Sequence, residues 1–284
     1  LSAEVVAVGS LTEGTDTGAI NLAPTTRYAL EPYFYCGHCP PCRRGATNCC
    51  ANLRVFGVHI DGGMREFAIV PISQLHPSST LSFEQLALVE PLSIGAHAVR
   101  RGQVTEGERV LVVGAGPIGL SVIQFALLAG ARVLVMDISE QRLEFCKRQW
   151  PETFCINASS NALAALQDVV ADDLPTAVFD ATGNSQSMMS AFHYTAHAGR
   201  LIFVGLFSGD ITFHDPDFHS RELSLLSSRN ATAKDFQRVI TALEAGQIDL
   251  APWITHRASP DAMIDAFPGW FDRNSGIIKA VVTF

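Results

Sequence analysis

Strand-like and helical patterns alternate from residue 109 to residue 207, and this alternation constrains the fold more than any other feature of the sequence. The strand-like runs are RVLVVG, RVLVMD, TFCIN, AVFDATG and GRLIFVGLF. Between them lie runs such as PIGLSVIQFALLAG and SEQRLEFCKRQW, whose apolar residues recur at helical spacing. A series of this kind folds as a parallel sheet covered by helices on both faces. We therefore predict an α/β domain with a doubly wound parallel sheet.

A glycine turn, GxGxxG at Gly114, Gly116 and Gly119, follows the first strand-like run and opens a helix, and Asp137 ends the next run. In this context the glycines permit a tight turn, a close approach of a pyrophosphate, and close packing of helix on strand. The carboxylate would accept hydrogen bonds from a ribose and repel a 2′-phosphate, which favours NAD over NADP. A structural turn beside a surface acid is the alternative. Arg142 could tolerate a phosphate, but on a helix that begins SEQR it is expected to be solvated or stacked on adenine. The predicted contacts are Gly114, Gly116, Pro117, Ile118, Gly119, Asp137, Ile138 and Arg142.

Charge and hydropathy restrict the partners. Lys and Arg number 20 against 28 Asp and Glu, a net charge of −8 without a long basic run, which argues against nucleic acids and anionic membranes. Residues 110–131 carry no charge, but four glycines and Pro117 divide them into a strand and a helix instead of a membrane span. The first residues lack a basic region typical of a secretion signal. We expect a cytoplasmic protein with a small-molecule substrate.

Five of the seven cysteines lie in CGHCPPCRRGATNCC, residues 36–50. Short spacers allow Cys36, Cys39, Cys42 and Cys50 to reach the corners of a tetrahedron around zinc. Adjacent residues do not easily face one ion, so either Cys49 or Cys50 is surplus. Four thiolates close the coordination sphere, and such a zinc stabilises the fold without taking part in chemistry. Disulfides and an iron–sulfur cluster are the alternatives, but the secretory context and the usual cluster spacings are missing.

The ends of the chain show other patterns. Residues 1 to about 90 contain the short strand-like runs EVVAVG, RYALEPYFY and MREFAIVP, and the polar residues 9–27 are expected to form an exposed loop. After residue 227, ATAKDFQRVITALEAG predicts an amphipathic helix and GIIKAVVTF a final strand.

Three segments together resemble the zinc-dependent medium-chain dehydrogenases over essentially the whole chain: the cysteine lobe, VEPLSIGAHA at 89–98, and VLVVGAGPIGL. The form EPLS, with Glu90 where alcohol dehydrogenases carry cysteine, is similar to the polyol and sugar-acid branch. GVHIDGGMREFAIVP, VGLFSGDITFHDPDFHSRE and SSRNATAKDF are similar to bacterial L-galactonate and L-gulonate 5-dehydrogenases.

This resemblance implies a GroES-like, β-rich catalytic domain at residues 1–92, a Rossmann domain at 93–227, and a segment at 228–284 that completes the catalytic domain. It also implies a second, catalytic zinc that binds the substrate hydroxyl and prepares hydride transfer to nicotinamide. Glu90 would be a ligand of this zinc or hold its water; alternatively, Glu90 and Pro91 simply begin a helix. The family's other ligands, in CGxD-like and GHE motifs, precede the strand represented by LSAEVVAVG. We expect them in an N-terminal segment outside this sequence; the alternative is a chain without a catalytic metal.

The resemblance assigns further residues to the site. His59 in GVHIDGG lies in a segment similar to one that lines the substrate cleft, where it could bind a hydroxyl or relay a proton; a solvent-facing histidine is the alternative. Members of the family contact nicotinamide near the end of the fifth Rossmann strand and at a turn that follows it. For the turn at 228–230, a charged turn without this role is the alternative. The matching residues are Val204, Gly205, Leu206, Ser228, Arg229 and Asn230.

The sequence thus predicts an enzyme, an NAD-dependent and zinc-containing dehydrogenase that oxidises a secondary hydroxyl of a polyol or sugar acid, with two zinc ions in the full-length chain. A homodimer or homotetramer is expected, joined through the edge at RELSLLSS. The alternatives are a noncatalytic NAD-binding protein with one structural zinc, and a zinc-free quinone reductase.

Overall fold

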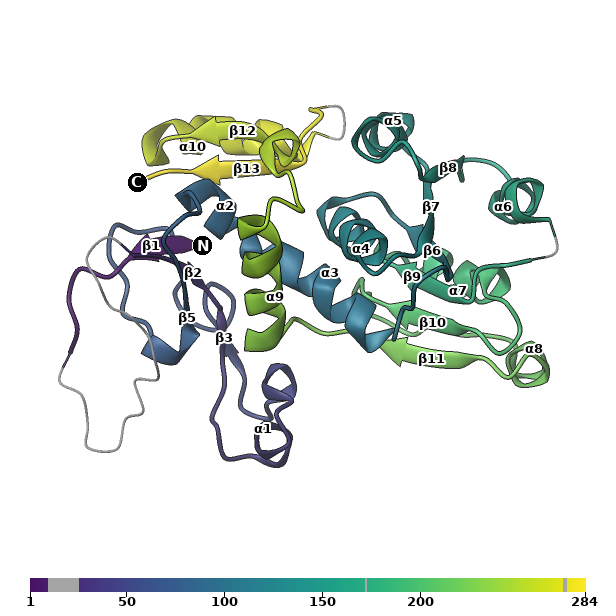
Figure 1. Cartoon of the computed structure of the whole chain (residues 1–284), viewed down its shortest axis with the longest axis horizontal. Coiled ribbons are helices and arrows are strands. Elements are labelled where there is room, and N and C mark those ends of the chain that lie inside the picture. Colours follow the sequence, from purple (N-terminus) through teal and green to yellow (C-terminus); the bar gives the residue numbers. More distant parts are fainter. Residues whose placement is uncertain (10–25, 172, 273–274) are drawn as a thin grey trace. The chain divides into compact units, whose positions relative to one another are not determined.

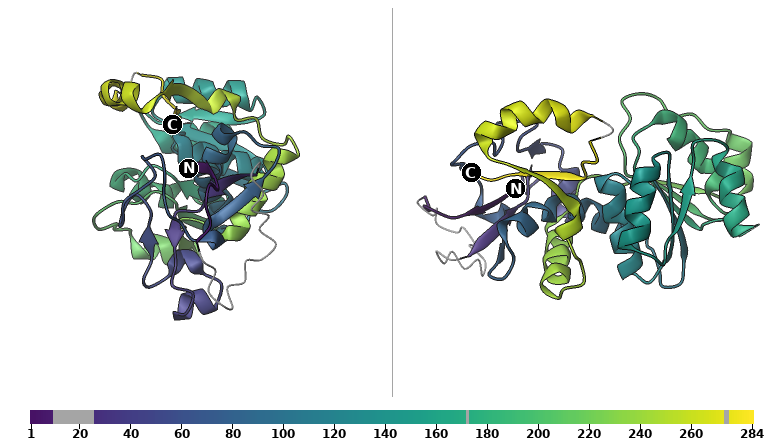
Figure 2. Two further views of the ribbon diagram at one scale, coloured as in Figure 1. Left: turned by 90° about the vertical axis from the view of Figure 1, so that its left-hand side faces the viewer. Right: turned by 90° about the horizontal axis from the view of Figure 1, so that it is seen from above.

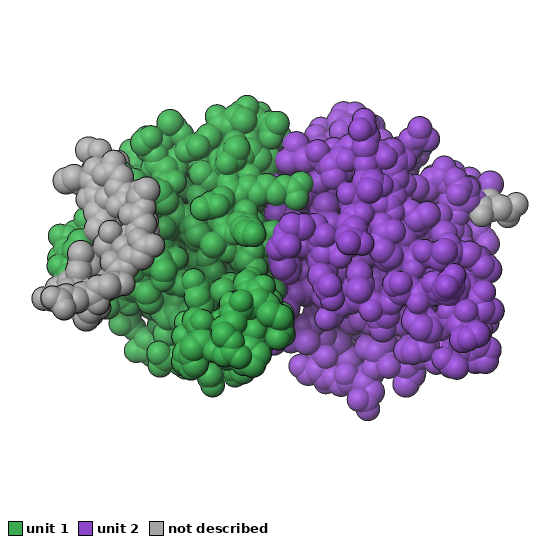
Figure 3. Space-filling model, turned by 60° about the horizontal axis from the view of Figure 1, so that its bottom comes forward, with its two compact units in different colours: residues 1–93, 230–284 green, residues 94–229 purple. Residues whose placement is uncertain are grey.

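A computed structural model gives the architecture and describes residues 1–9, 26–171, 173–272 and 275–284 (Figure 1). The loop expected at residues 9–27 falls almost entirely outside these described residues. The chain divides into two compact units, Leu1–Ser93 with Asn230–Phe284, and Ile94–Arg229, which Figure 3 colours separately.

The second unit is built on a six-stranded sheet in the order β11-β10-β9-β6-β7-β8. All its strand pairs are parallel, so the predicted α/β class with a doubly wound sheet is confirmed. The chain runs outward from β6 through β7 and β8, then returns to the other side of β6 for the remaining strands. This reversal between β6 and β9 is the place where open parallel sheets bind ligands, beyond the carboxyl ends of the strands. The strands are β6 Arg109–Val113, β7 Arg132–Asp137, β8 Phe154–Asn157, β9 Ala177–Asp180, β10 Arg200–Phe203 and β11 Ser224–Ser227.

Helices connect these strands and lie on both faces of the sheet (Figure 2). Several begin at residues whose side chains cap the free amides of the first turn: Ser139, Asn161 and Asn184 each accept a bond from an N–H three residues on. The helices predicted between strands are confirmed. They are α4 Pro117–Leu128, α5 Glu140–Gln149, α6 Ala162–Val170 and α7 Ser185–Tyr194, with α3 Val89–Arg101 before the sheet and the short α8 Asp215–Ser220 before β11.

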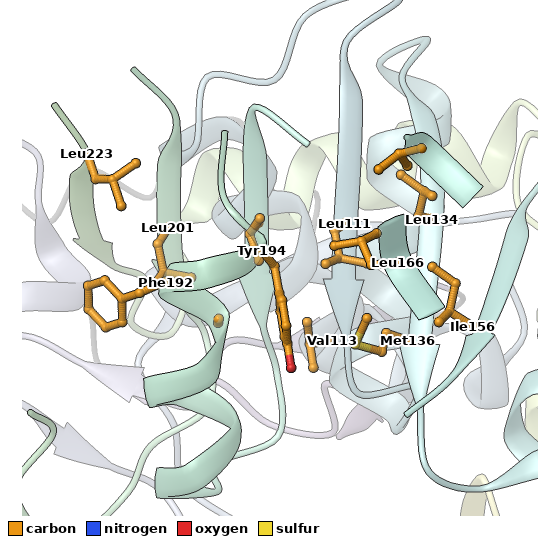
Figure 4. Packing of buried hydrophobic residues seen from close by; sticks show 13 residues of the cluster. Leu111, Val113, Leu134, Met136, Ile156, Leu166, Phe192, Tyr194, Leu201 and Leu223 are labelled. Atoms are coloured by element: carbon orange, nitrogen blue, oxygen red, sulfur yellow. The ribbon is translucent and has the colours of Figure 1, made fainter. Parts of the chain in front are cut away.

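One face of the sheet packs on α6 and α7 in a hydrophobic cluster (Figure 4). Alternate residues of each strand point to this face, as Leu111 and Val113 of β6 and Leu134 and Met136 of β7 do. Each such side chain contributes about 1.5–3 kcal/mol when fully buried. The cluster comprises Leu111, Val113, Leu134, Met136, Ile156, Leu166, Val170, Val178, Ala191, Phe192, Tyr194, Leu201 and Leu223.

The first unit contains short sheets and helices. Its antiparallel sheet has the order β1-β2-β5, while β3 pairs with β4 and β12 pairs with β13. The strands are β1 Ser2–Glu4, β2 Arg27–Leu30, β3 Tyr33–Phe34, β4 Arg54–Val55, β5 Leu75–Ser78, β12 Ile254–Ala258 and β13 Lys279–Val282. The helices are α1 Pro40–Arg43, α2 Phe83–Ala87, α9 Ala233–Glu244 and α10 Pro260–Ala266.

Helix α9 shows why the amphipathic pattern near residue 240 was informative. Thr232 and Asp235 form a capping box at its start, in which one carboxylate oxygen accepts bonds from the Thr232 N–H and hydroxyl at 3.0 and 2.8 Å. Phe236, Val239 and Leu243, at helical spacing, are all buried.

Two sequence expectations are wrong. The run EVVAVG, predicted as a strand, contributes only Glu4 to β1, and its apolar residues Val6 and Val8 are 74% and 48% exposed. The run MREFAIVP, predicted as a strand, has no strand assignment, and its apolar residues Met64, Phe67 and Ile69 are 60%, 63% and 99% exposed. A strand needs a neighbour for its backbone groups, and no described strand pairs with this segment.

The helices of the described ranges are all too short or too polar to cross a membrane.

Candidate cofactor and metal sites

The turn between β6 and α4 requires two of its glycines for reasons internal to the chain. Gly114 has a φ of +96°, a conformation that L side chains rarely adopt. A Cβ at Gly119 would lie 1.7 Å from the carbonyl oxygen of Gly114, so only glycine lets α4 approach the turn this closely. These two positions therefore define the geometry of the turn.

Gly116 is different, because the chain alone does not require glycine there. Its φ of −75° is ordinary, and a Cβ would meet only the Arg142 Nη1 atom, at 3.8 Å. Gly116 caps α4, whose first turn has no side-chain cap and begins with Pro117. The free space above uncapped helix amides fits a pyrophosphate, which needs close backbone approach and a helix N-terminus.

Asp137 ends β7 beside this turn, with its side chain 5% exposed. One carboxylate oxygen accepts from the Ala115 N–H at 2.6 Å and the other from the Ser139 N–H at 2.8 Å. Arg142 Nη1 lies 3.7 Å from the carboxylate, and the following Ile138 is 68% exposed. Asp137 thus braces the glycine turn while presenting a negative charge at the carboxyl end of its strand. The bond to Ala115 was not foreseen, since it depends on a contact between adjacent strands.

The other predicted dinucleotide contacts follow β10. The N–H groups of Val204 and Gly205 both donate to the carbonyl oxygen of Asp180 at 2.9 Å, and Leu206 is 88% exposed. A Cβ at Gly205 would lie 2.3 Å from the Gly183 nitrogen, so the turns after β9 and β10 are in tight contact. Sequence reasoning missed Asp180; its signal was an acid at the end of the strand-like run AVFDATG.

The segment after β11 contains the remaining predicted contacts. The Ser228 N–H donates to the Phe203 carbonyl at 2.8 Å, Arg229 is exposed, and Asn230 has a φ of +50°. The Ser228 hydroxyl and the Asn230 side-chain nitrogen are buried without a hydrogen-bond partner in the described part of the chain. Buried polar groups of this kind are normally paired, so a ligand is one way to satisfy them.

His59 occupies an exposed tight loop after β4. Its Nδ1 accepts a hydrogen bond from the Val55 N–H at 2.9 Å, and the backbone N–H of His59 donates to the Val55 carbonyl at 2.8 Å. A ring whose Nδ1 is an acceptor carries its proton on Nε2. His59 therefore offers a hydrogen-bond donor to solvent or to a ligand.

Glu90 lies in the first turn of α3 and accepts a hydrogen bond from the hydroxyl of Tyr33, which is 3% exposed. Burial raises the pKa of Tyr33 far above its ordinary value, and the Glu90 charge raises it further, so this hydroxyl remains a donor. Burial lowers the pKa of Lys279, an effect that the Glu90 charge opposes. Within the described residues, the one group of three or more potential ligands is the cysteine cluster. The described residues around Glu90 thus do not by themselves fit a catalytic zinc.

The cysteine lobe does bring four thiols together. The sulfur atoms of Cys36, Cys39, Cys42 and Cys50 all lie within 4.8 Å of one another, and Cys49 is exposed outside the group. Cys39 Sγ lies 3.4 Å from that of Cys42 and 3.8 Å from that of Cys50. Tetrahedral zinc with bonds of about 2.3 Å separates its sulfur ligands by about 3.8 Å, so the donor set fits this ion.

Backbone amides favour the thiolate at Cys36, whereas burial disfavours it at Cys42. N–H groups of His38 and Cys39 lower the pKa of Cys36 to about 6, whereas burial raises that of Cys42 to about 12. N–H groups of Cys36 and Asn52 both point at Cys50 Sγ, at 3.3 Å. Backbone amides aimed at sulfur stabilise negative charge there, and a bound cation would add to this effect.

Comparison with known proteins places these sites in context. Residues 117–245 match the model of the zinc-binding dehydrogenases, and residues 1–80 match that of the alcohol dehydrogenase GroES-like domain. L-galactonate-5-dehydrogenase of Escherichia coli K12 is 39% identical over 256 residues, covering 90% of this chain and 75% of that protein. 2-Dehydro-3-deoxy-L-galactonate 5-dehydrogenase of Pseudoalteromonas atlantica is 32% identical, with 99% and 80% covered. Further relatives are named L-arabinitol 4-dehydrogenase and L-idonate 5-dehydrogenase.

A solved structure shares the fold. An Escherichia coli alcohol dehydrogenase complexed with NADH superposes with a TM-score of 0.88 at 32% identity, covering 98% of this chain and 80% of the other.

Proposed function

This chain belongs to the zinc-type alcohol dehydrogenase family, and we propose that it oxidises a secondary hydroxyl group of a sugar acid or polyol to a ketone, with NAD as electron acceptor. The names of its relatives, which include dehydrogenases of L-galactonate and L-arabinitol, support this substrate class. The observation that carries the proposal is the turn at Gly116, open above uncapped helix amides, with the carboxylate of Asp137 beside it.

The residues of the second unit would bind the dinucleotide. The amides after Gly116 would hold the pyrophosphate, and Arg142, near that turn, would balance part of its charge. Asp137 would accept hydrogen bonds from the ribose hydroxyls of NAD. In NADP a phosphate replaces one of these hydroxyls. Val204, Gly205, Ser228 and Arg229 of this unit, together with the next residue of the chain, Asn230, would lie at the nicotinamide end. When bound, NAD would accept a hydride from the carbon that bears the substrate hydroxyl, and the hydroxyl proton would pass to solvent.

The residues of the first unit would bind the sugar. His59, with its proton on Nε2, would donate a hydrogen bond to a substrate oxygen. As a proton acceptor it would first have to move its proton to Nδ1, at the expense of the bond from Val55, so we propose binding as its main role. Tyr33 would hold the Glu90 carboxylate in one orientation. The four cysteines would hold the structural zinc, which keeps the lobe at residues 36–50 folded.

We also propose self-association through β11. This strand is at the edge of the sheet, with Leu225 38% exposed. Pairing of two such edges would satisfy their free backbone groups in a homodimer, from which a homotetramer could be built.

The test is a screen of the intact, zinc-loaded protein for NADH formation with aldonates and alditols, repeated with NADP, alongside metal analysis. We expect turnover of at least one sugar acid or polyol, preference for NAD, and two zinc ions in a full-length chain that includes the N-terminal ligands expected outside this sequence. Binding of NADH without any turnover would support a noncatalytic NAD-binding protein instead. Turnover of quinones with NADPH and no zinc would support a quinone reductase.

A further inference from the structure

Asp180 is a fully buried carboxylate that has no part in the roles proposed above. It is the last residue of β9, and in the sheet it is paired with Val113 of β6 on one side and Phe203 of β10 on the other. Asp180 therefore stands where three neighbouring chain segments leave the carboxyl edge of the sheet. Two of those segments, after β6 and after β10, contain proposed dinucleotide contacts.

The side chain of Asp180 fixes the turn that follows its own strand. One oxygen accepts from the N–H and the hydroxyl of Thr182 at 2.9 and 2.6 Å, and the other accepts from the Ser187 hydroxyl at 2.6 Å. The Thr182 hydroxyl accepts in turn from the Asn184 N–H at 3.1 Å. Burial raises the pKa of Asp180, and these donors oppose that effect. One carboxylate thus links the turn to the first helical turn of α7.

The main chain and the packing around Asp180 extend this link to the turns on both sides. Its carbonyl oxygen accepts the N–H groups of Val204 and Gly205. A Cβ at Gly183 would lie 2.9 Å from the Leu206 carbonyl oxygen, and one at Gly114 would lie 3.0 Å from Thr182 Cγ2. A shift of the turn after β9 would therefore displace both the glycine turn after β6 and the Val204–Leu206 segment.

We propose that Asp180 is a positioning residue for the dinucleotide: it holds the turns after β6, β9 and β10 in the one arrangement that the cofactor contacts. This rests on the proposed use of NAD. Thr182 and Leu206 are exposed, so burial of their side chains does not hold these turns in place. Without the carboxylate these turns would sample several arrangements, and the cofactor would have to order them when it binds.

The test replaces Asp180 by asparagine, which keeps the shape but removes the charge and one acceptor. Asp235→Asn is the matched control, because Asp235 is also a buried carboxylate that accepts from a threonine N–H and hydroxyl, in the first unit. The dissociation constant for NADH is measured by fluorescence titration at a temperature where all variants are folded. We expect about a tenfold weaker affinity for Asp180→Asn and a change of less than about twofold for Asp235→Asn.

A second pair of variants covers the case in which Asp180→Asn does not fold. Thr182 is exposed, so Thr182→Val should fold. This variant lacks the hydroxyl hydrogen bonds and should bind NADH about threefold more weakly. Thr182→Ser keeps a hydroxyl and should bind NADH with wild-type affinity. In steady state, KM for NAD should rise while KM for the sugar substrate stays constant. A folded Asp180→Asn protein that has a lower melting temperature but wild-type NADH affinity would overturn the proposal, as would equal affinities for the valine and serine variants. Failure of the wild-type protein to bind NADH would instead contradict the proposed function.

Discussion

Two alanine substitutions in the glycine turn should separate the fold from the cofactor site. In Gly119→Ala, the new Cβ would lie 1.7 Å from the Gly114 oxygen and 2.8 Å from its carbon. Both are backbone atoms and cannot rotate away, so α4 must move off the turn. Overpacking of a core typically costs 1–3 kcal/mol, and we expect about 2–3 kcal/mol here.

In Gly116→Ala, the new Cβ has only the end of the flexible Arg142 side chain nearby, at 3.8 Å. Alanine restricts the unfolded chain, which stabilises the protein by about 0.4–1 kcal/mol, and is a poorer helix cap than glycine, which offsets this gain. The free energy of unfolding should therefore stay within about 1 kcal/mol of wild type. The methyl group would, however, occupy space that the pyrophosphate needs, so NADH affinity should fall at least about tenfold.

The assay is urea unfolding of the intact, cofactor-free protein at constant zinc, combined with a fluorescence titration of each variant with NADH. Unchanged stability of Gly119→Ala would refute the close approach of α4 to the turn. Wild-type NADH affinity of Gly116→Ala would refute the reasoning that the pyrophosphate lies above this residue.

Three further predictions concern other parts of the molecule. Cys42→Ser should reduce the zinc content by one ion per chain and lower the melting temperature, whereas Cys49→Ser should change neither; metal analysis and calorimetry measure this. The hydrogen bond from Arg257 lowers the pKa of Glu84, so this pair stabilises the protein above the ordinary glutamate pKa of 4.5 and ceases to do so as the pH falls through the lowered value. Glu84→Gln should accordingly cost less than about 1 kcal/mol in urea unfolding at neutral pH, since both side chains are partly exposed, and progressively less as the pH falls below 4.5. A larger loss at the lower pH would contradict the sign. Leu225→Lys, on the exposed edge of β11, should convert an oligomer to monomers in light scattering, and an unchanged mass would contradict association through this edge.

The second unit could be predicted largely from local sequence. Its strands are apolar runs of four to six residues, because both faces of the sheet are covered, and its helices follow them with capping residues such as Ser139 and Asn184. The glycine turn was recognisable because the spacing of its glycines reflects backbone constraints that act within a few residues. The cysteine quartet was recognisable because its short spacers let four nearby thiols reach one ion.

Features that depend on distant partners were missed. MREFAIVP has the alternation of a strand but no described strand pairs with it, and strand formation depends on that partner. The bond between Tyr33 and Glu90 joins residues 57 positions apart, and nothing near either residue indicates it. Asp180 is similar, since its role arises only when β6 and β10 lie on either side of it. The choice between Cys49 and Cys50 likewise required the course of the chain in three dimensions.

The central claim is that the dinucleotide lies across the start of α4 with its adenosine ribose at Asp137. Calorimetric titration of the intact, zinc-loaded protein with NADH and with NADPH tests it most directly. Because a 2′-phosphate would face a buried carboxylate, NADH should bind at least about tenfold more tightly. Equal affinities, or tighter binding of NADPH, would contradict the account.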